Sequence, residues 1–271
     1  MADVLDIVDI DGVTRRLGNV DSAQGLLRAW PVFGDTPEAP LVPRSDWPAL
    51  IEALGRDHRD PHLPPTHDQN GYGACNASAT CAAIESCRLA MGLPDVRLSA
   101  GDLYGRINGG RDQGSLLEDG LAVAMQSGVA STDACPYLDW KHPNSGNAAA
   151  DRKRFRVLEA ALCPEFEHCM SAVLRGWKLI TGVMWFPNYK PDANGWLPKG
   201  SGRAGGHAIF GYKPAMRGAQ FGIWHRQSWG AWAPAFDNCF VIPESAYGRS
   251  IGGFWAVRNV VSEGGDMPQP T

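Results

Sequence analysis

The sequence predicts an α+β protein, because a first half typical of helices is followed by a second half typical of strands. Ala, Ser and Cys dominate residues 75–91, and a glycine and a proline follow closely, as they do after many helices. Seven of the ten tryptophans lie beyond residue 176, among β-branched and aromatic runs that favour strands.

Local signals place the individual elements along the chain. Helices are expected where helix formers run into a stop signal, at 75–91, 116–127 and 154–170. Strands are expected where apolar runs are bounded by Gly or Pro, at 178–186, 207–212, 221–229 and 238–242. Little regular structure is expected in the Pro-rich residues 43–70, and residues 1–42 are expected to form an extended arm with room for one strand.

The composition excludes several classes of protein. An apolar content of 44% and a charged content of 20% describe a globular chain with a sizeable core. A formal net charge of −4 argues against nucleic-acid binding by counterion release. No apolar run approaches the roughly 18 residues that cross a bilayer. The first twenty residues contain four aspartates and lack the apolar block of a secretory signal. We therefore expect a cytoplasmic protein that binds neither nucleic acid nor a membrane.

The chain has seven cysteines, which is enough for three disulfides and one free thiol. Without a secretory signal, seven reduced thiols are the favoured expectation. These residues are Cys75, Cys81, Cys87, Cys135, Cys163, Cys169 and Cys239.

Cys75 is the candidate nucleophile. A reactive thiolate needs electrostatic stabilisation, a neighbouring base and donors for a developing oxyanion. Cys75 lies at the predicted start of a helix, where backbone N–H groups and the helix dipole favour negative charge. Gln69 precedes it in DQNGYGAC, whose glycines permit a tight turn. The Gln69 amide and the Cys75 N–H are therefore the expected oxyanion donors. The alternative for Cys75 is a buried, inert thiol.

His207 is the candidate base. It lies in AGGHAIFGY (204–212), where glycines before it and an apolar strand after it would present the ring at a strand start. Gln227, in WHRQSWGAW (224–232), is the candidate to orient His207, and Trp229 can shield the bond between them. The alternatives are a structural histidine at His207 and a decayed site at Gln227.

These motifs, in this order and at this spacing, resemble the papain family of cysteine peptidases over roughly residues 43–258. Gln69, Gly73 and Cys75 are similar to the family's glutamine and Gly-Ser-Cys turn. GGHAIFGY resembles its histidine strand, and QSWG resembles its Asn-Ser-Trp-Gly. The closing VIPESAY and FWAV resemble the bacterial and viral branch.

The resemblance implies a papain-like two-lobed fold. Its helical left lobe, about 43–150, would carry a central nucleophile helix, and its right lobe, about 151–258, would be β-barrel-like. Residues 1–42 would then be an N-terminal arm and residues 259–271 a C-terminal tail.

The resemblance also implies roles for individual residues. Cys75 would be the nucleophile, His207 the general base and acid, and Gln69 an oxyanion donor. Gly114 and Ser115 match the segment that pairs with the backbone of an extended substrate. The implied partner is a peptide or protein substrate.

Three positions depart from the family pattern. Asn76 replaces the aromatic residue after the nucleophile, and Tyr72 replaces a disulfide cysteine. Gln227 replaces the family's Asn; it keeps the amide acceptor, but its extra methylene changes the reach. A misplacement of about 1 Å can cost on the order of a hundredfold in rate. The long inhibitory pro-segment of lysosomal relatives is also not expected, since only about 42 residues precede the domain.

Two functions are therefore predicted as the main alternatives, and deamidase, transglutaminase-like or other acyl-transfer chemistry on the same Cys–His pair is left open. The first is a cysteine peptidase that forms a thioester at Cys75. The second is a catalytically impaired structural or interaction module, for instance in a phage-type particle, which would bind other subunits through the arm 1–42 and locate to a virion.

No cofactor is expected. GSGRAG (200–205) fits a dinucleotide fingerprint but precedes a strand instead of opening a helix. Cys163, His168 and Cys169 could be pictured as metal ligands, but packing along one helix explains them better. The acidic residues of DQGSLLED do not have the spacing of a calcium loop.

Overall fold

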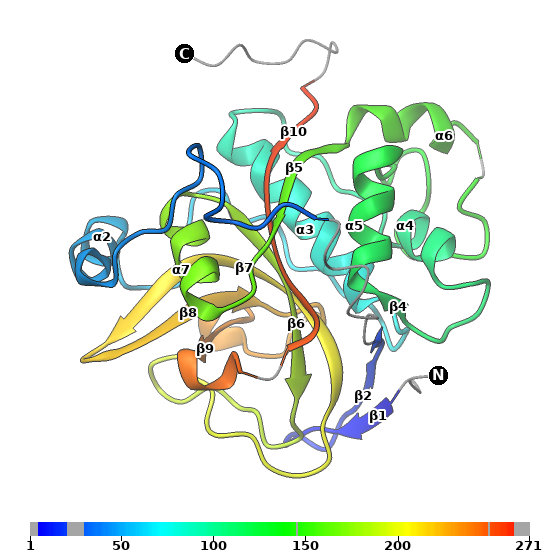
Figure 1. Ribbon diagram of the computed structural model, residues 1–271. Helices are drawn as coiled ribbons and strands as arrows, with labels where there is room; N and C mark the ends of the chain where they lie inside the picture. The colour runs from blue at the N-terminus through cyan, green and yellow to red at the C-terminus, as the bar shows by residue number, and fades with distance from the viewer. Residues whose placement is uncertain (1–4, 21–29, 145, 249, 263–271) are drawn as a thin grey trace.

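The computed structural model describes residues 5–20, 30–144, 146–248 and 250–262. A central helix, α3 (Cys75–Ala90), lies between a helical part and a six-stranded sheet (Figure 1). The helical part contains α4 (Ala100–Ile107), α5 (Leu117–Gln126) and α6 (Ala148–Asp151). Helix α3 contacts α4 and α5 on one side and the sheet on the other.

The sheet is antiparallel throughout, with the strand order β5-β10-β6-β7-β8-β9. Its long central strand β7 pairs with β6 so that His207 lies opposite Val183. The strands are β5 (Val157–Leu162), β6 (Lys178–Trp185), β7 (Gly205–Arg217), β8 (Gln220–Arg226), β9 (Cys239–Pro243) and β10 (Ser250–Val260). All four expected strands are thus confirmed, with shifted ends, and β10 continues past the domain boundary expected at residue 258.

Helix α3 matches the expected helix 75–91 and is almost completely buried. Its many Ala, Ser and Cys side chains are small enough to let several neighbours approach the helix closely. One hydrophobic cluster joins α3 to one face of the sheet through Phe210, Tyr212 and Trp255. A second cluster on the opposite face contains Trp185 and Phe240. The two clusters hold the central strands between them.

The expected helix 154–170 is wrong. The chain there forms strand β5, which pairs with β10, and then helix α7 (Phe166–Leu174). Pro164 separates the two elements, since proline removes a backbone donor and obstructs a helix interior. Cys163 consequently precedes α7, whereas His168 and Cys169 lie within it.

The expectation of little structure in residues 43–70 is also incorrect in part. Helix α2 (Trp47–Leu54) begins there after a 3-10 turn at Arg44–Asp46, with Pro48 in the first helical turn, where proline is well tolerated. Trp47 and Ile51 are fully buried and belong to the second cluster. Tertiary burial therefore stabilises a helix that composition alone did not indicate.

The N-terminal arm contains more strand than the single one expected. A hairpin joins β1 (Leu5–Val8) to β2 (Thr14–Leu17), and β3 (Asn19–Val20) pairs in parallel with β4 (Ser115–Leu116). Residues 21–29 of the arm lie outside the described residues. The remaining short elements are 3-10 turns at Arg152–Arg154, Pro234–Phe236 and Glu244–Ala246. Over the described ranges, no helix is both long and apolar enough to span a membrane.

Candidate active site

Cys75 is the first residue of α3, and its side chain is fully buried. Burial raises the pKa of the Cys75 thiol, because the low-dielectric surroundings disfavour the thiolate. The neighbouring backbone amides of Ala208 and Gly18 act in the opposite direction, because N–H groups near the sulfur favour the thiolate. Ala208 directly follows His207 on β7, so this contact brings the two candidate residues to the same place.

His207 and Gln227 are joined as the sequence predicted, by a distance of 2.6 Å between His207 Nε2 and Gln227 Oε1. Gln227 Oε1 also accepts from the Ser228 N–H at 3.0 Å, which assigns the oxygen to this end of the amide. His207 must therefore donate from Nε2, which leaves Nδ1 as the basic nitrogen of the neutral ring. Nδ1 is buried and has no hydrogen-bond partner among the described residues.

The His207 ring is enclosed by aromatic side chains. Trp229 stacks on it with ring centroids 4.7 Å apart, and Trp185 meets it edge-on. Burial lowers the pKa of His207 to about 4, against a smaller upward effect of the bond to Gln227. In this conformation the candidate pair is a neutral thiol and a neutral imidazole.

A hydrogen bond to its amide oxygen fixes the orientation of the Gln69 side chain. Gln69 Oε1 accepts from Ser228 Oγ at 2.8 Å, which leaves Nε2 as the donor at the other end of the amide. Nε2 donates to the carbonyl oxygen of Tyr72 at 2.6 Å and to that of Arg16 at 3.0 Å. Arg16 belongs to the N-terminal arm, so the expected oxyanion donor holds a peptide carbonyl of the chain itself.

The arm occupies the segment that was expected to bind substrate backbone. The Ser115 N–H donates to the Gly18 carbonyl at 2.8 Å, and Asn19 lies opposite Ser115 in the parallel β3–β4 pair. The Asn19 side chain crosses to the β-rich side and donates to the Ile251 carbonyl at 2.7 Å. Residues 16–19 therefore bridge the helical part and the sheet directly over Cys75.

The fit between arm and cleft depends on glycines. A Cβ atom at Gly18 would overlap the backbone of Gly73, and one at Gly114 would overlap the Gly18 carbonyl. On the opposite wall, a Cβ at Gly206 would overlap the Asn19 carbonyl. A side chain at any of these positions would separate the arm from the cleft.

Ion pairs add to the backbone contacts of the arm. Arg16 binds Asp112 at 2.7 Å and Asp6 at 2.9 Å, and its side chain is one-third exposed. Asp112 also accepts from the Gly73 N–H at 2.8 Å and from the Tyr104 hydroxyl at 2.7 Å. One carboxylate thus links the arm to the turn that precedes Cys75. Sequence analysis missed this role of the arm, because the paired residues are about 100 positions apart.

Asn76 fills the position that departs from the family pattern. It is fully buried and donates to the Leu116 carbonyl at 2.6 Å and to Ser115 Oγ at 3.1 Å. Gly120 must be a glycine here, because a Cβ atom would approach the Asn76 amide too closely. Asn76 therefore anchors the β4 segment to α3.

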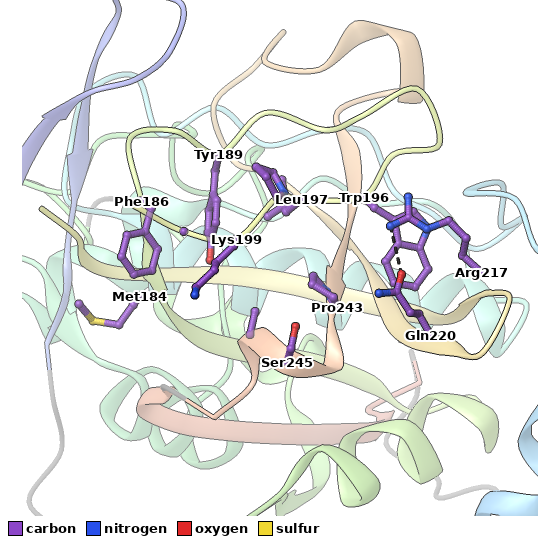
Figure 2. A pocket seen from close by; sticks show the side chains of 13 residues that line it. Met184, Phe186, Tyr189, Trp196, Leu197, Lys199, Arg217, Gln220, Pro243 and Ser245 are labelled. Atoms are coloured by element: carbon purple, nitrogen blue, oxygen red, sulfur yellow. Dashed lines mark hydrogen bonds between the residues drawn. The ribbon is translucent and has the colours of Figure 1, made fainter. Parts of the chain in front are cut away.

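A wide cavity is separate from this site. It measures about 630 Å³ and shares no lining residue with the Cys75 cleft. Phe186, Tyr189 and Trp196 line it, together with Lys199 and Arg217 (Figure 2). A smaller cavity of about 280 Å³ lies next to Gln69 and Trp229, beside the arm.

Within the described residues, no group of three His, Cys, Asp or Glu side chains is placed to hold a metal ion. All seven cysteines are unpaired and buried.

Two buried histidines predict acid sensitivity. Burial lowers the pKa of His207 to about 4 and that of His225 to about 3, from an ordinary value of 6.5. Between pH 6.5 and 4 the unfolded chain binds these protons and the folded chain does not, so stability falls as the pH falls. Each histidine then lowers the free energy of unfolding by about 1.4 kcal/mol per pH unit.

Urea unfolding between pH 7 and pH 4 measures this dependence. His225→Leu should reduce the slope of stability against pH by the contribution of one proton. Equal slopes for His225→Leu and the unmodified chain would contradict the prediction.

No protein-family model matches the chain, and no curated protein is similar enough to count as a match. Solved structures are similar in fold. Xylellain, a cysteine protease from Xylella fastidiosa, is 20% identical with a TM-score of 0.71, over 90% of this chain and 96% of its own. ProCathepsin B S9 from Trypanosoma congolense is 15% identical with a TM-score of 0.60. The match covers 91% of this chain and 87% of that chain.

The bromelain protease from Ananas comosus, solved in complex with the E64 inhibitor, is 18% identical with a TM-score of 0.59. The match covers 73% of this chain and 94% of that chain. Similarity at this level of identity establishes the fold, which is that of the papain-like cysteine proteases.

Proposed function

We propose that this chain is a cysteine peptidase with Cys75 as nucleophile, held latent by its own N-terminal arm. The observation that carries the proposal is the hydrogen bond from Gln69 Nε2 to the Arg16 carbonyl. It places a peptide carbonyl on the expected oxyanion donor, in a segment of the arm whose Gly18 amide also acts on the Cys75 sulfur. The cleft thus already binds an extended polypeptide.

The proposed reaction begins when the Cys75 thiol gives its proton to His207 Nδ1. The sulfur attacks the carbonyl carbon of the scissile bond, and the oxyanion is held by Gln69 Nε2 and the Cys75 N–H. The tetrahedral species collapses to a thioester as Nδ1–H protonates the leaving amine. Water, deprotonated by Nδ1, then hydrolyses the thioester and restores the thiol. Gln227 keeps Nδ1 basic throughout by accepting from Nε2–H.

The arm is bound in a register that this reaction cannot use. Gln69 holds the carbonyl of Arg16, whereas the group at the sulfur is the N–H of Gly18, and the Gly18 carbonyl is bound by Ser115. Attack requires one and the same carbonyl to contact the sulfur and the oxyanion donor. We infer that the arm must leave the cleft before a substrate enters.

The test uses a peptide epoxide that alkylates a cysteine-peptidase nucleophile, together with a library of unstructured peptides. We expect a single adduct at Cys75, located by mass spectrometry among the seven cysteines, and loss of peptide hydrolysis in proportion to labelling. Cys75→Ala should neither label nor hydrolyse. Labelling spread over several cysteines, or hydrolysis that survives in Cys75→Ala, would reject the proposal. A folded chain that hydrolyses no peptide even when Gly18→Ala displaces the arm would favour the interaction module instead.

A further inference from the structure

We propose that Tyr137, His67 and Glu85 form a buried positioning chain that sets the Gln69 oxyanion donor relative to Cys75. None of the three touches the reacting atoms. The inference rests on the proposed peptidase function, because it assigns a way in which the site of that function is held in place.

The three side chains are linked end to end. His67 Nδ1 lies 2.8 Å from the Tyr137 hydroxyl, and His67 Nε2 lies 3.0 Å from Glu85 Oε2. The side chains of His67 and Glu85 are at most 2% exposed. The Asp68 N–H, directly before Gln69, donates to the same Tyr137 hydroxyl at 2.9 Å.

The direction of every hydrogen bond in this chain follows from the Glu85 carboxylate. Glu85 accepts from the Leu98 N–H at 2.7 Å and from Arg97 at 3.3 Å, so it acts as an acceptor. His67 must donate to it from Nε2, and burial lowers the pKa of His67, which favours the neutral ring. Nδ1 is then an acceptor, and the Tyr137 O–H donates to it. The hydroxyl oxygen remains free to accept from Asp68.

This chain connects the oxyanion segment to the helix that carries the nucleophile. Glu85 belongs to α3, the helix that begins at Cys75. At the other end, Gln69 N–H donates to the Ser228 carbonyl at 2.9 Å, next to Gln227. Residues 67–69 are therefore held between α3 and the segment that orients His207. A shift of this segment would move Gln69 without moving the Cys75 sulfur.

Loss of the Tyr137 hydroxyl removes the partner of two groups at once. In Tyr137→Phe the buried His67 Nδ1 loses its donor, and an unpaired buried polar group is unfavourable. The Asp68 N–H, at an exposed residue, loses the protein acceptor that fixes its position and is left to water. The segment is expected to relax by a movement that carries Gln69 with it. Oxyanion stabilisation should weaken, while formation and reactivity of the thiolate should not.

The experiment compares variants in a chain that also carries Gly18→Ala, so that the arm does not limit the rate. Tyr137→Phe is expected to lower kcat roughly tenfold with little change in KM. The affinity for a peptide aldehyde, whose hemithioacetal places an oxyanion in the same site, should fall by a similar factor. Alkylation of Cys75 by iodoacetamide, which needs no oxyanion donor, should keep its rate. Combined with Gln69→Ala, Tyr137→Phe should cause no further loss.

Tyr212→Phe is the matched control, because it also removes a buried hydroxyl, one that donates to the His58 carbonyl at 2.6 Å, outside the chain of contacts above. It should leave the aldehyde affinity unchanged. The inference would be overturned, and the proposed function left standing, by either of two results. One is that Tyr137→Phe lowers the rates of alkylation and hydrolysis equally. The other is that Tyr137→Phe lowers kcat further in a chain that already carries Gln69→Ala. If Gln69→Ala itself had no effect, or if the arm-released chain hydrolysed nothing, the proposed function would fail and the inference with it.

Discussion

Replacing Gly18 with alanine is expected to raise peptide hydrolysis by the full chain roughly tenfold to hundredfold. A Cβ atom at position 18 would overlap the backbone of Gly73, which cannot move aside as a flexible side chain can. Overpacking of this kind costs about 1–3 kcal/mol. Because position 18 belongs to the arm, the strain weakens binding of the arm and leaves the walls of the cleft intact.

Initial rates on a fluorogenic peptide measure the effect, with the rate of Cys75 alkylation as a second readout. Both should rise, since an emptied cleft exposes the thiol to solvent. Gly248→Ala is the matched control, because a Cβ atom there meets nothing within 4 Å. If Gly18→Ala and Gly248→Ala had the same rates, the arm would not be what limits activity.

Gln227→Ala is expected to lower kcat by about 10²–10⁴-fold in the Gly18→Ala background. The amide oxygen of Gln227 makes His207 donate from Nε2, and without it the ring can adopt the tautomer whose Nδ1 carries the proton. That tautomer cannot accept the Cys75 proton, and loss of tautomer control is costly in related Ser-His chemistry. Affinity for the peptide should change little, because within the described ranges the hydrogen bonds of Gln227 go to His207, Ser228 and Asn238 and not to the arm.

Gln227→Asn shows whether the length of the side chain matters as well as the presence of an amide oxygen that accepts from His207. The shorter amide keeps the acceptor but must shift toward His207, so we expect an intermediate kcat. Gln220→Ala, at an exposed end of the β7–β8 hairpin, should leave kcat unchanged. Full activity in Gln227→Ala would mean that another group controls the His207 tautomer.

Local patterns were sufficient for the elements that form the site. The small residues and glycine stop of α3, and the apolar runs of β6 to β9, specify their own conformations, so these elements were predicted correctly. The pairing of His207 with Gln227 was also predicted, because both lie in short motifs whose order along the chain is informative. Where a proline signal was overlooked, at Pro164, one expected helix became a strand and a shorter helix.

The state of the site could not be predicted in the same way. Gly18 lies against Gly73 and Gly114, which are distant from it in the sequence. A glycine has no side chain, so the local sequence gives no sign of such a contact. His67 likewise gains its partners, Tyr137 and Glu85, only when two loops and α3 meet. The burial and the hydrogen bonds of Gly18 and His67 therefore depend on the tertiary structure and not on the neighbouring residues in the sequence.

The sequence by itself determined the α+β class and helix α3, and it singled out Gln69, Cys75, His207 and Gln227 as candidate site residues, because local conformational preference and motif spacing are encoded in neighbouring residues. Only the tertiary structure decided that the arm lies across Cys75 and that burial keeps both Cys75 and His207 neutral. The physical reason is that desolvation and close backbone approach arise from whichever distant segments come together, and neither has a signal in the local sequence.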